Sequence, residues 1–151
     1  MPSRRPDIRP VAALIAFLAL FAAAGAAAAE TVTVDVGAVY ASNEGSSVDP
    51  ALREIRGKLR AMFNYTSYRM LDRKRQTLAV GASGDFALPG QRSMRVSPLQ
   101  SPPNKVRLLI RIEEAGKQLL TTTLGMPRGG MVLVGGPSYQ SGVLILIIAA
   151  E

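Results

Sequence analysis

The 151-residue sequence contains no cysteine, no histidine and no tryptophan. Without cysteine and histidine, the chain cannot build a Ser-His-Asp or Cys-His catalytic group, nor a zinc site based on those side chains. It also cannot form a disulfide, so its folding is independent of the redox state of its compartment. The amino-acid composition therefore predicts no metal site and no cofactor.

Acidic residues are few, with 11 Asp and Glu against 18 Lys and Arg, which gives a formal net charge of +7. The adjacent pair Glu113-Glu114 cannot converge on one substrate in a strand, because neighbouring side chains point to opposite faces. Carboxylate catalysis would require a pocket where two of the scattered acids meet. The candidates are Asp35, Asp49, Glu54, Asp72 and Asp85. We therefore predict that the protein is not an enzyme and has no catalytic residue.

The first thirty residues have the order of a secretory signal peptide. Arginines in the first ten residues precede a leucine-rich run at residues 11–21, and a small-residue run ending in three alanines at 27–29 follows. We expect residues 1–29 to be the signal peptide and the mature chain to be periplasmic or otherwise extracytoplasmic. The alternative is an uncleaved anchor, because the apolar stretch approaches the ~20 residues that span a bilayer.

Residues 30–151 have the pattern of a single α+β domain, which we expect to be mostly one antiparallel β-sheet of about six to eight strands. The clearest alternation lies at residues 105–113, where apolar side chains face one way: Val106, Leu108, Ile110 and Ile112. Other predicted strands cover residues 31–41, 65–72, 76–80, 86–88, 93–96 and 117–124. The segments 65–72 and 76–80 could instead form one long strand.

One amphipathic helix is predicted near residues 50–63. The carboxylate of Asp49 can cap it, and Pro50 suits a first position that needs no amide hydrogen. The expected buried stripe is Leu52, Ile55, Leu59, Met62 and Phe63. Gly57 within the helix costs ~1 kcal/mol relative to alanine, so we expect a close packing contact there.

The C-terminal region, residues 129–151, contains two apolar runs separated by glycine and proline. We predict strands at 131–134 and 143–149, joined by residues 135–142 into the closing hairpin. The near-continuous apolarity of the second run favours a central strand buried on both faces, with the helix over one of them. The run is far shorter than the ~20 residues of a membrane helix, so we expect no integral membrane protein after cleavage.

Basic residues form two groups near the predicted helix. The helix carries Arg53, Arg56 and Arg60, and the following segment carries Arg69, Arg73, Lys74 and Arg75. Together these side chains could bind an anionic lipid, lipopolysaccharide, wall polymer or acidic protein. The alternative is an ordinary solvated surface. Tyr65 and Tyr68 between the groups also suit single-stranded nucleic acid, but an extracytoplasmic location favours no nucleic-acid partner.

Two stretches resemble known proteins. Residues 41–71, ASNEGSSVDPALREIRGKLRAMFNYTSYRML, and the VGGP…GVLI end resemble a group of small exported bacterial proteins of unknown function. That resemblance implies export and a compact domain. Residues 120–137, LTTTLGMPRGGMVLVGGP, are similar in rhythm to the sheet region of secretins, the outer-membrane pores of secretion and pilus systems. Pro137 replaces the usual apolar residue and the lip motif is absent, so this likeness implies at most a small accessory protein.

These features together predict an exported, non-catalytic binding or assembly module of the bacterial cell envelope. It would work through a protein partner, as an accessory to a secretion or pilus system. The alternative function is a basic envelope protein that binds anionic lipid, lipopolysaccharide or wall polymer.

Overall fold

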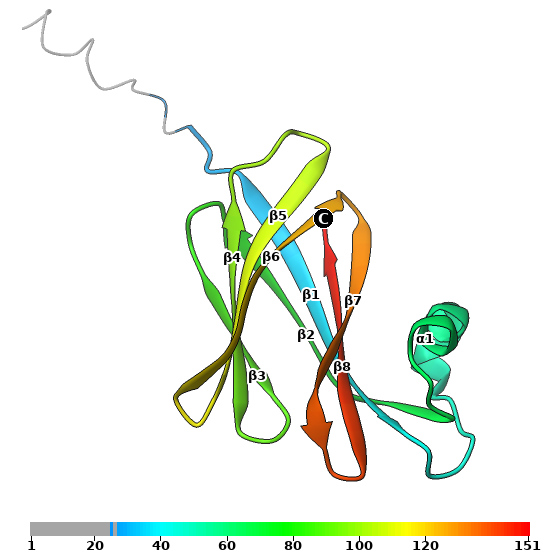
Figure 1. Ribbon diagram of the computed structural model, residues 1–151. Coiled ribbons are helices and arrows are strands. Elements are labelled where there is room, and N and C mark those ends of the chain that lie inside the picture. The colour runs from blue at the N-terminus through cyan, green and yellow to red at the C-terminus, as the bar shows by residue number, and fades with distance from the viewer. Residues whose placement is uncertain (1–24, 26) are drawn as a thin grey trace, which may run out of the picture.

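The computed structural model describes residue 25 and residues 27–151 of the chain. The predicted signal peptide, residues 1–29, lies almost wholly outside these residues, so cleavage and export remain predictions. The described part contains eight strands and one short helical segment, arranged as two facing sheets with the helix outside one of them (Figure 1).

Each sheet has four antiparallel strands. The first sheet has the order β2 (Ser67–Ala79), β1 (Thr31–Ser42), β8 (Gly142–Ala150) and β7 (Gly130–Tyr139). The second sheet has the order β3 (Gly84–Leu88), β4 (Arg92–Leu99), β5 (Lys105–Glu114) and β6 (Lys117–Pro127). The predicted antiparallel strand content is confirmed, but the prediction of one sheet is wrong.

The division into two sheets follows from the alternation of the strands. Because a half-buried strand has one apolar face, two such sheets bury their apolar faces against each other. Val34 and Leu146 of the first sheet and Phe86 and Ile110 of the second belong to one buried cluster. Arg92 closes one end of this core, where its Nη2 donates to the Ser138 carbonyl oxygen at 3.0 Å and lies 2.9 Å from Glu114 Oε1.

Strand β8 is buried on both faces, as its apolar run predicts. It lies between β1 and β7 in the first sheet. Leu146 and Ile148 face the second sheet, whereas Ile145 and Ile147 pack in a second cluster beneath the helical segment. The first sheet is therefore the middle layer of the molecule (Figure 1).

The helical segment consists of a 3₁₀ turn, η2 (Pro50–Ile55), followed by α1 (Arg56–Met62). Asp49 caps it as predicted, since Asp49 Oδ1 accepts a hydrogen bond from the Ala51 amide at 2.9 Å. Leu52 and Leu59 are buried, but Met62 is 58% exposed, contrary to the predicted stripe. Ile55 and Phe63 are partly buried against the same cluster as Leu52 and Leu59, so Met62 is the one predicted stripe residue that is exposed.

The close contact expected at Gly57 is absent. Gly57 is exposed, and a Cβ built there meets no atom within 4 Å. Among the described residues, no helix has both the length and the apolarity needed to cross a membrane.

Several strands are longer than the segments that the sequence predicts, including β4, which spans Arg92–Leu99, and β6, which spans Lys117–Pro127. Residues 65–72 and 76–80 contribute to one long strand, β2, which was the alternative prediction. Residues 135–139, predicted as a loop, belong to β7. They remain in the strand because the register shifts between Gly135 and Ser138, and such an irregularity at a sheet edge accommodates Pro137.

Candidate binding groove

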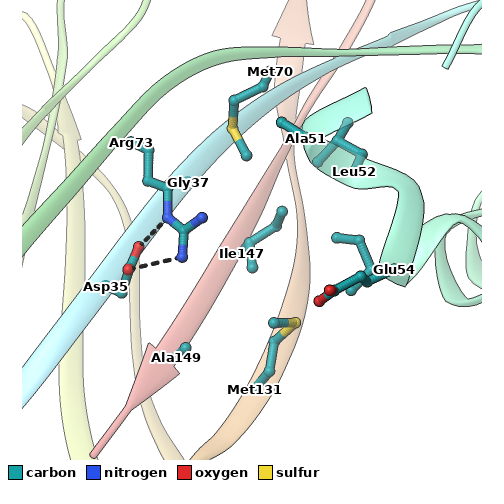
Figure 2. Close-up of a pocket in the computed structure, with 11 residues that line it drawn as sticks. Asp35, Gly37, Ala51, Leu52, Glu54, Met70, Arg73, Met131, Ile147 and Ala149 are labelled. Carbon is teal, nitrogen blue, oxygen red and sulfur yellow. Dashed lines mark hydrogen bonds and ion pairs between the residues drawn. The ribbon is translucent and has the colours of Figure 1, made fainter. Parts of the chain in front are cut away.

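The helical segment covers only part of the outer face of the first sheet, and a groove remains beside it. The groove is a pocket of about 110 Å³ between η2 and the strands β1, β2, β8 and β7. Figure 2 shows Ala51 and Glu54 on its helical side and Asp35 with Arg73 on the opposite side. Ile147 and Met131 lie between these two sides.

Small residues form the floor of the groove. Gly37 of β1 is buried, and a Cβ built there would lie 3.4 Å from the Met70 side chain and 3.5 Å from Ile147 Cβ. Ala149 of β8 contributes only a methyl group to the same lining. Met131 on the edge strand β7 is 42% exposed. The groove is thus hollow because its central positions carry little or no side chain.

One wall of the groove is fixed by the carboxylate of Asp35. The register pairs Asp35 directly with Arg75, and Gly37 with Arg73, so both arginines extend along the same face of the sheet. Asp35 Oδ1 accepts from Arg73 Nε at 2.9 Å, and Oδ2 accepts from Arg73 Nη2 at 3.0 Å. Arg75 Nε lies 3.3 Å from Asp35 Oδ2.

These contacts hold the Asp35 carboxylate in its charged form. The hydrogen bonds from Arg73 lower the pKa of Asp35, and the charges of Arg73 and Arg75 act in the same direction. Partial burial opposes them by favouring the neutral acid, but the net pKa remains below its usual value. The same pairing raises the pKa of Arg73.

Two of the acids considered for catalysis, Asp35 and Glu54, line this groove. A pair of catalytic carboxyls needs one member that holds a proton near neutral pH. Asp35 is unsuited to that role because its two arginine partners lower its pKa. Glu54 is exposed and has no ion pair with another described residue.

The basic residues of β2 do not present one common surface. Arg73 and Arg75 share Asp35 on the outer face, whereas Lys74 points the other way because strand side chains alternate. Lys74 Nζ lies 3.2 Å from Asp72 Oδ2. Arg69 places its guanidinium carbon 5.6 Å from the centre of the Tyr40 ring. Local partners thus engage all four side chains.

The basic residues of the helical segment are different. Arg53, Arg56 and Arg60 are exposed, and none forms an ion pair with a residue that the structure describes. Any binding role for the seven predicted basic residues remains a prediction, and these three keep their charges available to solvent.

Sequence reasoning missed the apolar residues of the groove. Asp35 and Gly37 lie on the face of β1 opposite its row of valines, and the glycine on that face is the signal that was present. A glycine inside a strand often marks a site where another group approaches closely. Met131 and Ala149, which line the groove together with Gly37, come from the C-terminal hairpin. They lie near Gly37 only because the C-terminal strand pairs with β1, which is distant in the sequence.

Comparison with known proteins adds no assignment, because no family model, curated protein or solved structure matches the chain. The resemblances to small exported proteins and to secretins therefore remain predictions from the sequence.

Proposed function

We propose that the protein is a non-catalytic binding module of the bacterial cell envelope that holds a protein partner in the groove beside η2. The observation that carries this proposal is the uncovered apolar strip on the outer face of the first sheet, with exposed Met131 at its edge. Charged side chains rim the strip, namely Asp35, Glu54 and Arg73. Apolar patches with polar rims are typical of protein-interaction sites.

The size of the groove favours a side chain of a protein over a free metabolite. Pockets for small-molecule ligands usually enclose roughly 300–1,000 Å³, whereas this one encloses about 110 Å³. An engineered cavity of about 150 Å³ holds one benzene molecule, so the groove suits a single apolar side chain. The exposed carboxylate of Glu54 and the guanidinium of Arg73 can bond the backbone on either side of it.

The envelope part of the proposal is supported by the predicted signal peptide and by the absence of cysteine. The two resemblances point to the same compartment, and the secretin-like rhythm of residues 120–137 favours an accessory role in a secretion or pilus system.

Site-specific photocrosslinking in the native envelope tests this function. A photoreactive residue at Met131 should capture one polypeptide reproducibly, because that position borders the groove. The matched control carries the photoreactive residue in place of Ala87, an exposed position on the second sheet. Equal capture from the two positions, or none from Met131, would contradict a partner in the groove.

A second candidate function is binding to an anionic lipid or polymer through the helical segment. The observation that favours it is the exposure of Arg53, Arg56 and Arg60 without acidic partners among the described residues. Vesicles that contain anionic phospholipid should retain the protein at low salt, and replacement of all three arginines by serine should abolish that retention. Retention that persists in the triple variant would eliminate this candidate.

A further inference from the structure

The two sheets have four edge strands, and three of them are protected against pairing with another chain. An edge presents unpaired backbone N–H and C=O groups, which natural proteins cover with charges, proline, short length or side-chain contacts. Strand β2 carries the charged run at residues 72–75. Strand β3 has five residues, and its Asp85 carbonyl accepts from Gln76 Nε2 at 2.8 Å. Strand β7 contains Pro137, and its Ser138 carbonyl accepts from Arg92.

Between its two terminal residues, strand β6 lacks these protections. It has eleven residues, with no charge after Lys117 and no proline before Pro127. Among the described residues, its backbone forms no hydrogen bond other than those of its pairing with β5. Leu119 and Leu120 are 42% and 38% exposed. This edge can therefore accept another strand along most of its length.

Two pockets flank the open edge. A pocket of about 170 Å³ lies between β6 and β7, where its lining includes Leu120, Gly136 and Pro137. A pocket of about 440 Å³ lies toward the other end of β6, where its lining includes Arg107 and Gly125. A Cβ built on Gly125 would meet no atom within 4 Å, so this second pocket is open above the strand.

The two pockets match the geometry of one added strand. Leu120 pairs with buried Ile112 and faces the core side, whereas Gly125 pairs with exposed Arg107 and faces outward. Leu120 and Gly125 are five positions apart along β6, which corresponds to about 17 Å at roughly 3.3 Å per residue. Because successive side chains alternate, a single extended segment can direct one side chain inward near Leu120 and another outward near Gly125.

We propose that β6 binds an extended segment of a partner protein by strand addition, with an apolar side chain in the smaller pocket and acidic side chains on the outer face, within reach of the long basic side chains that extend from β5 across β6. The charge preference comes from Lys105, Arg107 and Arg111, which are exposed on the outer face of β5. None of the three forms an ion pair with a described residue. Main-chain hydrogen bonds supply affinity in strand addition, and side-chain pockets supply specificity.

A second copy of this chain fits the edge less well than an acidic segment. Antiparallel pairing of two β6 strands would place Arg107 and Arg111 of both copies on neighbouring parts of one continuous sheet. The chain carries a net charge of +7, and like charges across an interface oppose association. The edge on the second sheet is also separate from the groove on the first, so the two surfaces can be tested independently.

The test uses the folded protein and labelled eight-residue synthetic peptides that alternate valine with aspartate or valine with lysine. Fluorescence anisotropy should show at least about tenfold tighter binding of the aspartate peptide, which corresponds to ~1.4 kcal/mol. Methylation of alternate backbone nitrogens in that peptide should weaken binding by about tenfold or more, because it removes main-chain donors. Arg107→Glu should reduce this preference, because it replaces one of the three basic side chains of β5 with an acidic one.

Matched variants locate the site. Gly125→Val fills the larger pocket and should weaken binding of the aspartate peptide, whereas Ala87→Val on β3, the opposite edge strand of the same sheet, should leave the affinity unchanged. Ala51→Phe in the groove should also have no effect. Binding that is insensitive to backbone methylation would overturn the proposal, because attraction would then be purely ionic. Dimerisation of the free protein through β6, detected by sedimentation, would assign the edge to a second copy and overturn it too.

Discussion

Asp35 and Arg73 form a two-point ion pair across adjacent strands, with Nε–Oδ1 and Nη2–Oδ2 distances of 2.9 and 3.0 Å. The Asp35 side chain is 12% exposed and that of Arg73 is 62% exposed. A nearly buried carboxylate is thus compensated by a guanidinium that reaches solvent. This pair fixes one wall of the groove, and it should contribute to stability as well as to shape.

Replacement of Asp35 by Asn should destabilise the protein at neutral pH by about 1.5–3 kcal/mol, the usual range for a hydrogen bond to a charged group. Two arginines would lose their shared acceptor. Urea unfolding at pH 7 measures the loss. Asp85→Asn is the matched control, since the Asp85–Arg95 pair lies at the exposed surface and should matter less. An equal loss in both variants would contradict a special role for Asp35.

The stability of the wild-type protein should also fall in acid through Asp35. Its pKa is lowered in the folded state, so the unfolded chain takes up a proton at a higher pH than the native protein does. The stabilisation is therefore complete above the usual pKa near 4 and disappears as pH falls through the lowered native pKa. Urea midpoints measured from pH 6 to pH 2 should drop less steeply in Asp35→Asn. Equally steep curves for the wild type and Asp35→Asn would show that the pKa of Asp35 is the same in the folded and unfolded states.

Tyr68 should anchor the helical segment that forms the other wall of the groove. Its buried hydroxyl donates to the Phe63 carbonyl oxygen at 2.7 Å, just beyond the end of α1. Tyr68→Phe should cost about 1–2 kcal/mol because that carbonyl loses its partner. Tyr139→Phe removes a hydroxyl with no hydrogen bond to a described residue and should cost less. Thermal unfolding measures the loss of stability in each variant. Equal losses would show that the Tyr68 hydroxyl does not anchor the helical segment.

Two glycines should respond in opposite directions to alanine. At Gly57 in α1 a methyl group meets no atom within 4 Å, so Gly57→Ala should stabilise by roughly 0.5–1 kcal/mol through helix propensity. At Gly142 the same methyl group would overlap the Ala41 carbonyl oxygen on the neighbouring strand. Gly142→Ala should therefore destabilise by more than about 2 kcal/mol. Urea unfolding checks both signs, and a neutral Gly142→Ala would show that β1 and β8 separate easily.

The three helix arginines should be dispensable for folding. Arg53, Arg56 and Arg60 are exposed, and surface substitutions usually change stability by less than about 0.5 kcal/mol each. The triple serine variant should remain within ~1 kcal/mol of the wild type in urea unfolding. A larger loss would show that these arginines are structural and would remove them as a binding surface.

Local patterns predicted much of this fold. The alternation over β5, the Asp49-Pro50 start of the helical segment and the buried C-terminal strand all depend on neighbours in the sequence, and all are present. The first sheet and the groove depend instead on long-range pairing, because β1 pairs with β8 near the other end of the chain. Asp35 meets Arg73 only because β1 and β2 pair in one register, and a slip of one residue would reverse every side chain.

The exposure of Met62 shows a further limit of sequence patterns. The helical pattern places Leu59, Met62 and Phe63 on one side of the segment, but only Leu59 and Phe63 pack in the buried cluster. Neither the 3₁₀ turn nor the exposure of Met62 has a strong local signal in the sequence.

The central claim, that a partner side chain occupies the groove, is tested most directly by the crosslink from position 131 in two matched phenylalanine variants. Ala51 borders the groove, whereas Ala61 is exposed on α1 away from the groove lining. Ala51→Phe should obstruct the pocket and reduce the crosslinked fraction by about tenfold, and Ala61→Phe should leave it at the wild-type level. An undiminished crosslink in Ala51→Phe would contradict the account.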